Sequence, residues 1–253
     1  PFAVNLPMLY PDIEKHIQAI IDENVPIVFT SAGNPKTYTK SLKEKGKIVV
    51  HVVASSKFAM KAEEAGVDAV VAEGFEAGGH NGREETTTFC LIPIVKKAVK
   101  IPVIAAGGIA DGKQMLAAFC LGAEGVQVGS RFVASVESSA HENFKNAVIN
   151  TKEGDTILTL KELTPVRLLK NSFYEKIEKA YEECATEEQL KEILGRGRAK
   201  KGMFEGDMAE GELEIGQISG NIREILPAAE IVNSMMREYQ VALQQLNNLP
   251  DYK

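Results

Sequence analysis

The chain has 253 residues, of which 44% are hydrophobic and 25% charged, and its formal net charge is -6 at pH 7. This is the composition of an ordinary globular protein. The negative charge, and the lack of a basic stripe with interleaved aromatic residues, argue against nucleic acid as a partner. No apolar run approaches the roughly 18 residues that span a bilayer, and no signal peptide is visible. We therefore expect a cytoplasmic protein with no membrane partner.

Three cysteines, Cys90, Cys120 and Cys184, are an odd number without CxxC spacing. This pattern is typical of reduced thiols in a cytosolic protein. We expect neither disulfides nor a metal site.

Apolar runs and amphipathic stretches alternate through the first half of the chain. The apolar runs, predicted as strands, begin near Phe2, Pro26, Lys47, Asp68, Pro102 and Gly125. The predicted helices between them are Pro11–Asn24, Pro35–Lys45, Ser56–Ala65, Ile92–Val99 and Gly112–Leu121. A strand and a helix every 20 to 25 residues or so predict a parallel α/β fold.

Two parallel architectures fit this pattern, a doubly wound sheet and a (β/α)8 barrel. The barrel is favoured because the candidate site residues, from Asn5 to Ser130, follow strands, and barrel sites lie on that rim. The last two strands are followed by turns suited to a phosphate, as strands 7 and 8 of barrels often are. The six visible strands are then strands 3–8 of an N-terminally incomplete TIM barrel, which agrees with a start at Pro1 without an initiator Met.

The pattern changes after Phe132. Residues Ser138–Glu192 are charged and helical in character, and Met203–Gly220 is glycine- and acid-rich, which predicts an ordered loop. Asn221–Leu249 predicts a long amphipathic helix, bent or interrupted around Pro227. The expected domains are a barrel portion, a C-terminal helical cap and a last helix that packs on the barrel, over residues 1–135, 136–214 and 215–253.

Two glycine turns follow the last two strands. Gly107 and Gly108 begin the segment GGIADG, which opens a helix, and bare backbone N–H groups at a helix N-terminus bind phosphate. A simple tight turn is the other interpretation. Gly129 and Ser130 form a second such turn one unit later, and the pair favours a phosphate-bearing ligand. Neither turn is a Walker loop or a GxGxxG dinucleotide motif.

His80 lies in the stretch DAVVAEGFEAGGHNG, where a buried strand runs into a glycine-rich turn. The other histidines have simpler interpretations: His16 and His141 as surface residues of helices, and His51 as a core residue of a strand. A single histidine suits proton transfer near neutral pH. No GxSxG nucleophile accompanies it, and no second His or Cys stands at metal-ligand spacing. These absences favour a mechanism in which a cofactor carries the hard step and His80 moves a proton.

Other polar residues have a functional and a structural interpretation. Glu73 and Glu76 either orient His80, bind ribityl hydroxyls or lie at the rim. Residues Thr86–Thr88 line a pocket or cap a helix. A second set either covers an anionic ligand or lies on a solvated surface: Arg167, Lys170, Asn171, and the basic cluster of Arg196, Arg198, Lys200 and Lys201.

Three linked motifs, GFEAGGHNG, PVIAAGGIADG and LGAEGVQVGSRF, resemble the nitronate monooxygenase (2-nitropropane dioxygenase) family, which includes the FMN-dependent enoyl-acyl-carrier-protein reductases. The match covers about Pro1–Ser139 strongly and continues more weakly through RLLKN and EIGQISG.

The resemblance implies a (β/α)8 barrel that binds FMN, with His80 as the catalytic histidine. It places the flavin phosphate on Gly107, Gly108, Gly129 and Ser130, where the family usually has Thr in place of Ser130. Asn5, Glu73, Gly78, Gly79 and Ala106 are expected beside the flavin. The family also has an N-terminal flavin contact of GGM type, which this sequence lacks.

Three hypotheses follow. In the first, a nitronate monooxygenase, His80 handles the proton next to the nitro group, and FMN and O2 carry the oxidation. In the second, an enoyl-acyl-carrier-protein reductase of fatty acid synthesis uses NAD(P)H, and the basic cluster steers the acidic carrier protein. In the third, the barrel binds a phosphate ligand without catalysis. A homodimer is compatible with all three.

Overall fold

The computed structural model describes residues 2–248, so Pro1 and Leu249, which bound two predicted segments, lie outside the described residues. The chain divides into two compact units. The first consists of Pro1–Gly74, Thr86–Ala106 and Ala118–Gln127, and the second of Phe75–Glu85, Gly107–Ala117 and Val128–Lys253.

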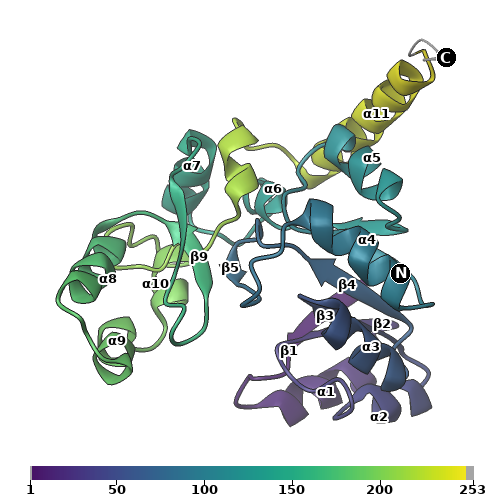
Figure 1. Cartoon of the computed structure of the whole chain (residues 1–253), viewed down its shortest axis with the longest axis horizontal. Helices are drawn as coiled ribbons and strands as arrows, with labels where there is room; N and C mark the ends of the chain where they lie inside the picture. Colours follow the sequence, from purple (N-terminus) through teal and green to yellow (C-terminus); the bar gives the residue numbers. More distant parts are fainter. Residues whose placement is uncertain (1, 249–253) are drawn as a thin grey trace. The chain divides into compact units, whose positions relative to one another are not determined.

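The first unit contains a six-stranded, fully parallel sheet in the order β1-β2-β3-β4-β6-β7. Its strands are β1 (Ala3–Pro7), β2 (Ile27–Ser31), β3 (Ile48–Val53), β4 (Ala69–Glu73), β6 (Val103–Ala106) and β7 (Gly125–Gln127). The sheet curls into a half-barrel, with the helices around it (Figure 1). The predicted six strands of a barrel-type fold are confirmed.

Burial on both faces explains why the strands are so apolar. On β4, Val70, Val71 and Ala72 are fully buried, although neighbouring residues of a strand point to opposite faces. Val71 and Ala69 of β4 pack in one cluster with Val50 of β3 and Ala106 of β6. The helices of this unit are α1 (Ile13–Asp22), α2 (Thr39–Glu44), α3 (Ser56–Glu64) and α4 (Thr88–Ala98), and α5 (Gly112–Cys120) is divided between the two units, with its residues up to Ala117 in the second.

Two details differ from the sequence prediction. Asn5 was expected just after a strand but lies in the middle of β1, paired with Phe29 of β2. Helix α4 begins at Thr88 rather than Ile92, because the Thr88 side chain, hydrogen-bonded to the Ala106 carbonyl at 3.3 Å, fits the first turn. Thr87 stands at the N-cap, but its side chain makes no capping hydrogen bond.

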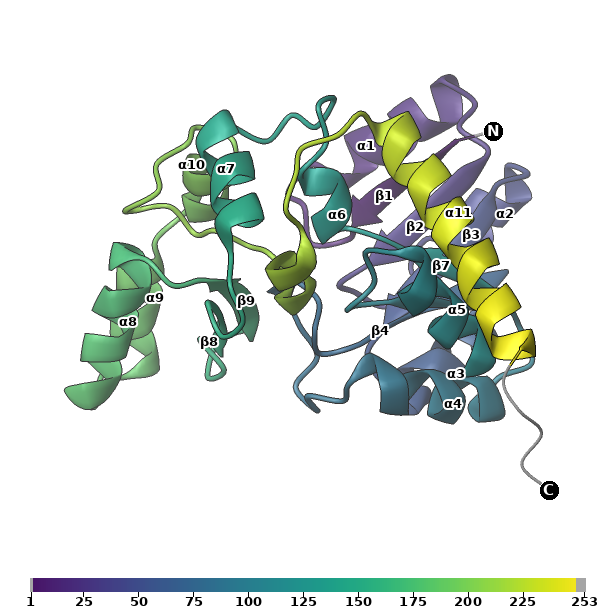
Figure 2. The ribbon, with the colours of Figure 1, turned by 90° about the horizontal axis from the view of Figure 1, so that it is seen from above.

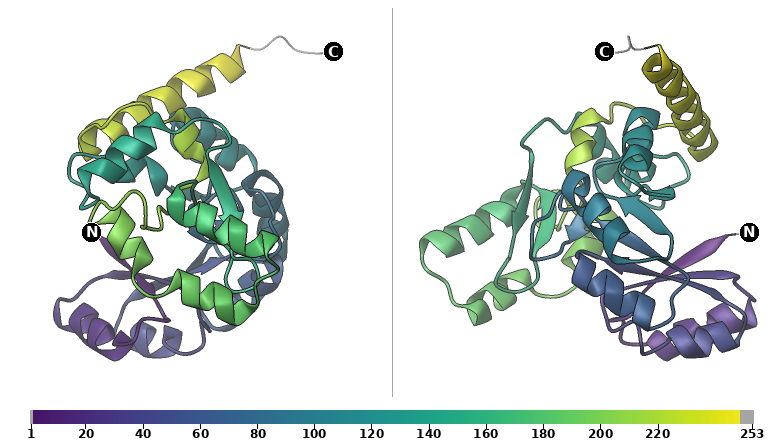
Figure 3. Two further views of the ribbon diagram at one scale, coloured as in Figure 1. Left: turned by 90° about the vertical axis from the view of Figure 1, so that its left-hand side faces the viewer. Right: turned by 45° about the vertical axis from the view of Figure 1, so that its right-hand side comes forward.

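The second unit is built around a small antiparallel sheet in the order β5-β9-β8. Its elements are β5 (Gly79–His80), α6 (Ser130–Val133), α7 (Glu142–Asn150), β8 (Thr156–Thr159), β9 (Val166–Leu169), α8 (Ser172–Glu182), α9 (Glu187–Leu194), α10 (Arg198–Met203), the 3-10 helix η1 (Gln217–Asn221) and α11 (Ala228–Asn247). Figure 2 labels β8 and β9 beside the green helices α8 and α9, and Figure 3 gives two further views.

The prediction that Ser138–Glu192 is helical is wrong for β8 and β9. All four residues of β9 are buried, so the strand lacks the alternation of apolar and polar residues that marks a half-buried strand. The helix predicted over Asn221–Leu249 begins only at Ala228, with Pro227 as the N-cap of α11, a position where the lack of a backbone N–H costs no helical hydrogen bond. The residues between η1 and Pro227 are not helical.

Residues 136–214 and 215–253 both fall in the second unit. Their division into a cap and a final helix stays a prediction. Within residues 2–248, no helix combines the length and the apolar character needed to cross a membrane.

Candidate active site

His80 is held by backbone pairing with a strand far along the chain. Gly79 pairs with Arg167 and His80 with Val166, in antiparallel register. Gly79 has a φ of +75°, a conformation that L side chains rarely adopt, and this glycine turns the chain into β5. The imidazole is exposed, whereas the strand that fixes its backbone is buried.

Arg167 anchors the loop before His80 from the same strand. Its guanidinium donates to the Phe75 carbonyl through Nε at 3.2 Å and Nη2 at 3.1 Å, and it stacks on the Phe75 ring at 4.5 Å. The side chain is 2% exposed, and burial lowers its pKa. The interpretation of Arg167 as a residue of a solvated surface is therefore wrong: Arg167 is a buried strand residue. Asn171 caps α8 and donates to the carbonyls of Met208 and Gly211.

A pocket of about 230 Å³ opens beside His80. Its lining includes two acidic side chains that sequence reasoning did not single out, Glu212 and Glu214. Glu214 forms a bridge with Leu168 on β9, and a Cβ on Gly79 would lie 2.7 Å from its Oε2 atom. Strand β9 thus brings together His80 and Glu214, which are 134 positions apart in the chain.

The two carboxyl groups are shifted toward their protonated forms. Burial, and to a lesser extent the charge of Glu214, raise the pKa of Glu212 to about 7, while His80 and Arg198 act in the opposite direction. Burial also raises the pKa of Glu214. Glu212 is 7% exposed. A proton can therefore reside near the imidazole at neutral pH.

The predicted phosphate turns leave neighbouring strands of the sheet. Ala106 of β6 pairs with Gln127 of β7, and each turn begins one or two residues further on. Gly107 and Gly108 have φ values of +93° and +68°, so consecutive N–H groups can form an anion-binding concavity. A Cβ on Gly129 would meet no atom within 4 Å, which leaves open space at the second turn. These residues fit a phosphate group.

Three of the predicted residues meet around one segment, Ile215–Gln217. The Gly216 N–H donates to Ser130 Oγ at 3.0 Å, and the Gln217 N–H donates to the Glu76 carbonyl at 2.9 Å. A Cβ on Gly78 would stand 2.4 Å from the Ile215 carbonyl carbon, and one on Gly108 would lie 3.5 Å from Glu76 Cβ. The signal in the sequence was the EIGQISG motif, whose central glycine fits between Ser130 and Gly78.

The remaining predicted site residues belong to the first unit. Glu73 is the last residue of β4, and desolvation raises its pKa to about 7. The next N–H, that of Gly74, donates to the Ala106 carbonyl at 2.9 Å, so both predicted positions lie at the carboxyl edge of the sheet. Asn5 lines a cavity of about 370 Å³ over the inner face with Phe29 and Ile104.

The other histidines match their structural interpretations. His16 is exposed on α1. His141 caps α7, where its Nδ1 accepts from the Asn143 N–H. His51 is 4% exposed in β3, its Nδ1 lies 2.7 Å from Thr30 Oγ1, and burial lowers its pKa to about 4.

The basic cluster is largely neutralised by carboxylates of the same region. Arg198 and Lys200 pair with Glu210 and Glu205 at 3.4 and 3.3 Å, and Lys201 pairs with Asp207 at 3.0 Å. Arg198 also stacks on Phe173 at 4.4 Å. Of the four basic residues of the cluster, Arg196 alone is exposed and forms no ion pair with the described residues. No group of three or more His, Cys, Asp or Glu residues there could hold a metal ion.

The family model described as nitronate monooxygenase matches residues 3–238. The chain belongs to the nitronate monooxygenase family. A relative from Staphylococcus aureus strain MSSA476, described as a probable nitronate monooxygenase, is 35% identical over 248 residues, which are 94% of this chain and 67% of that protein. A relative from strain MRSA252 with the same description is 43% identical over 153 residues, but only 43% of its length is covered.

Two solved structures share the fold over nearly the whole chain. FabK from Thermotoga maritima is 44% identical with a TM-score of 0.91, and the match covers 98% of this chain and 78% of that one. The nitroalkane oxidase from Streptomyces ansochromogenes is 28% identical with a TM-score of 0.80, covering 97% and 82%. Membership of the nitronate monooxygenase family, predicted from three motifs, is confirmed.

Proposed function

We propose that this protein is an FMN-dependent oxidoreductase that reduces an enoyl thioester, with NAD(P)H as electron donor and His80 as the proton-transferring group. The observation that carries the choice of reaction is the 44% identity to FabK over 98% of the chain. FabK is an enoyl-acyl-carrier-protein reductase, and FMN dependence is general among these relatives. The identity to the nitroalkane oxidase is lower, at 28%.

The residues that would hold FMN are divided between its phosphate and its ring system. Gly107, Gly108, Gly129 and Ser130 would bind the phosphate through N–H groups and one hydroxyl. The positions proposed beside the flavin ring and ribityl chain are Asn5, Glu73, Gly78, Gly79 and Ala106. When bound, FMN supplies the redox chemistry that no side chain of the site can perform.

His80 moves the proton in this proposal. Its exposed imidazole opens on the pocket that holds Glu212 and Glu214. A ring nitrogen of the protonated form donates to the carbonyl oxygen or to the carbon next to it. Because Glu212 has a pKa of about 7, it can return a proton to His80 near neutral pH.

Anaerobic flavin reduction tests the proposal. The purified protein is first examined for flavin absorbance and then mixed with NADH, NADPH or an alkyl nitronate without oxygen. We expect rapid reduction by one nicotinamide and reoxidation by crotonyl thioester. A protein that retains no flavin would leave only the non-catalytic binding barrel.

Nitronate oxidation is the second candidate function. The description of the family model and the nitroalkane oxidase structure favour it. In that reaction His80 would handle the proton on the carbon next to the nitro group, and O2 would be the oxidant. Rapid reduction of the flavin by nitronate alone, with no reduction by either nicotinamide, would place this candidate first.

The ion pairs of the basic cluster weaken one reason for expecting an acyl carrier protein as partner. With three of the four cations paired, steering toward an acidic protein has little free charge to act through. The thioester itself, rather than its carrier, is therefore the substrate that we propose. A cytoplasmic location and a homodimer remain proposals from the sequence.

A further inference from the structure

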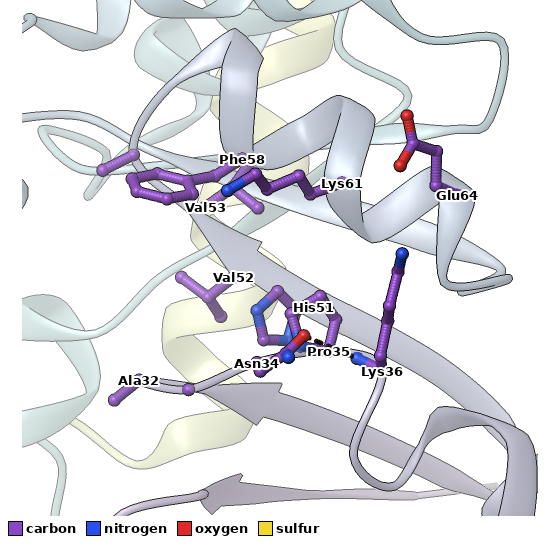
Figure 4. A pocket seen from close by; sticks show the side chains of 12 residues that line it. Ala32, Asn34, Pro35, Lys36, His51, Val52, Val53, Phe58, Lys61 and Glu64 are labelled. Atoms are coloured by element: carbon purple, nitrogen blue, oxygen red, sulfur yellow. Dashed lines mark hydrogen bonds between the residues drawn. The ribbon is translucent and has the colours of Figure 1, made fainter.

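A pocket of about 620 Å³ in the first unit is lined by none of the residues proposed above to bind FMN or to transfer a proton. It opens where β2 and β3 end, between the loop of residues 32–36 and helix α3 (Figure 4). Val53, which lines the pocket, pairs with Ala72, the neighbour of Glu73, so the pocket lies along the same carboxyl edge as the proposed flavin residue. Ligand sites of barrel enzymes are built on this edge.

Two lysines face the pocket from opposite walls. Lys36 comes from the loop after β2, and Lys61 comes from α3 (Figure 4). Both are exposed, and neither ammonium group forms an ion pair within residues 2–248. In contrast, Lys40 on α2 is paired with Glu44 at 3.9 Å. Two cations without an ion-pair partner in the lining of one pocket favour an anionic ligand there.

An aromatic ring and a buried histidine complete the lining. The Phe58 side chain is 46% exposed, and Lys61 Nζ lies 5.7 Å from its ring centroid. His51 is 4% exposed, and its Nδ1 is engaged by Thr30, while its second ring nitrogen has no hydrogen-bond partner in the described residues. A neutral imidazole there offers one further polar contact to a ligand. Glu64, one turn beyond Lys61, adds a carboxylate that can accept from an N–H donor.

We propose that this pocket binds a phosphate ester whose organic arm is flat or amide-bearing, with Lys36 and Lys61 as the cations available to its phosphate. Phe58 then offers a stacking face for the arm, and Glu64 accepts from its amino or amide N–H. The inference rests on the proposed function, because that reaction uses two such esters: the adenosine phosphate part of NAD(P)H and the phosphopantetheine part of an acyl thioester.

Direct binding to the full chain tests the assignment without any turnover. Inorganic phosphate, AMP, 2′,5′-ADP and 4′-phosphopantetheine are titrated separately by calorimetry at low and at moderate salt. The variant is Lys36→Gln with Lys61→Gln, and the matched control is Lys40→Gln with Lys57→Gln, whose exposed lysines do not line the pocket. The double variant should bind the best ester about tenfold more weakly, and the control about as well as the unchanged protein.

The relative affinities identify the source of the ester. Tighter binding of AMP or 2′,5′-ADP assigns the pocket to the nicotinamide cofactor, and tighter binding of 4′-phosphopantetheine assigns it to the thioester. Phe58→Ala should weaken the nucleotides more than it weakens inorganic phosphate. Equal binding of all esters by the double variant and the control would overturn the proposal, as would esters that bind no better than inorganic phosphate.

Flavin absorbance and its reduction by NADH or NADPH are recorded on the same samples. If the flavin is retained and reduced but the lysine variant binds esters normally, the pocket assignment fails and the function stands. If no flavin is retained but ester binding depends on the two lysines, the function fails and the pocket stands.

Discussion

Each unit contains one histidine next to or within a buried strand: His51 lies in β3, and His80 lies in β5, which pairs with β9. The first side chain is buried and the second is exposed. In the parallel sheet, His51 is enclosed and bonded to Thr30, and burial lowers its pKa to about 4. In the antiparallel sheet, His80 is exposed at a pocket with two carboxyl groups. A histidine held neutral in a core serves packing, whereas an exposed one beside Glu212, whose pKa is about 7, can exchange a proton with that carboxyl group. The difference arises from the neighbours, since both side chains extend from strands.

The largest effect expected from this comparison is on turnover. His80→Ala should keep the flavin and lower turnover with the enoyl thioester by about a hundredfold or more, the range of a lost general acid. His16→Ala, on the exposed face of α1, is the matched control and should leave turnover unchanged. Steady-state rates and flavin absorbance are the measurements. Full turnover in His80→Ala would remove this residue from the reaction.

Gly78→Ala should destabilise the protein by about 3 kcal/mol, because overpacking against backbone is poorly relieved. The new Cβ would stand 2.4 Å from the Ile215 carbonyl carbon. Gly129→Ala is the contrast: its Cβ meets nothing within 4 Å, so stability should be kept while flavin is lost if the phosphate lies there. Urea unfolding and flavin content separate the two effects. Equal stability of both variants would contradict the close approach at Gly78.

Glu212 should make stability fall as pH rises. Its folded pKa is about 7, above the ordinary value of 4.5, so the folded state holds the proton more tightly and its contribution is lost between these two values. Glu212→Gln should remove this slope and gain on the order of 2 to 3 kcal/mol over the parent by pH 8. Chemical unfolding from pH 4 to pH 8 measures it, with the exposed Glu182→Gln as control. An unchanged slope would mean that Glu212 is not held protonated.

The smallest effect concerns the enclosed histidine. Thr30→Val removes the hydroxyl that lies 2.7 Å from His51 Nδ1 and leaves that buried nitrogen without its partner. We expect a loss of about 1 kcal/mol in the free energy of unfolding. Thr37→Val, at an exposed loop position, should cost little. If Thr30→Val is as stable as the parent, the contact does not contribute to holding His51 in place.

The parallel sheet was readable in the sequence because its signals are local. Each strand is a short apolar run, and each helix has a stripe and a terminator such as Gly46 or Gly66, both with positive φ. The motif around His80 was visible for the same reason, since its glycines and its histidine are contiguous. The position of the two glycine turns after the last two strands predicted a phosphate-bearing ligand, and the motifs that contain these turns indicated the family.

Tertiary structure alone decided what surrounds the histidine. Strand β9 has no alternating pattern, and only its pairing with β5 and its bridge to Glu214 bring the two acidic side chains to His80. Glu212 and Glu214 look like solvated charges in an acid-rich loop, and it is burial by distant residues that raises their pKa values. Sequence determined which residues can do chemistry, because residue type and local backbone are encoded within a few positions. Contacts between residues 130 positions apart set their protonation, because desolvation depends on everything that packs around a group.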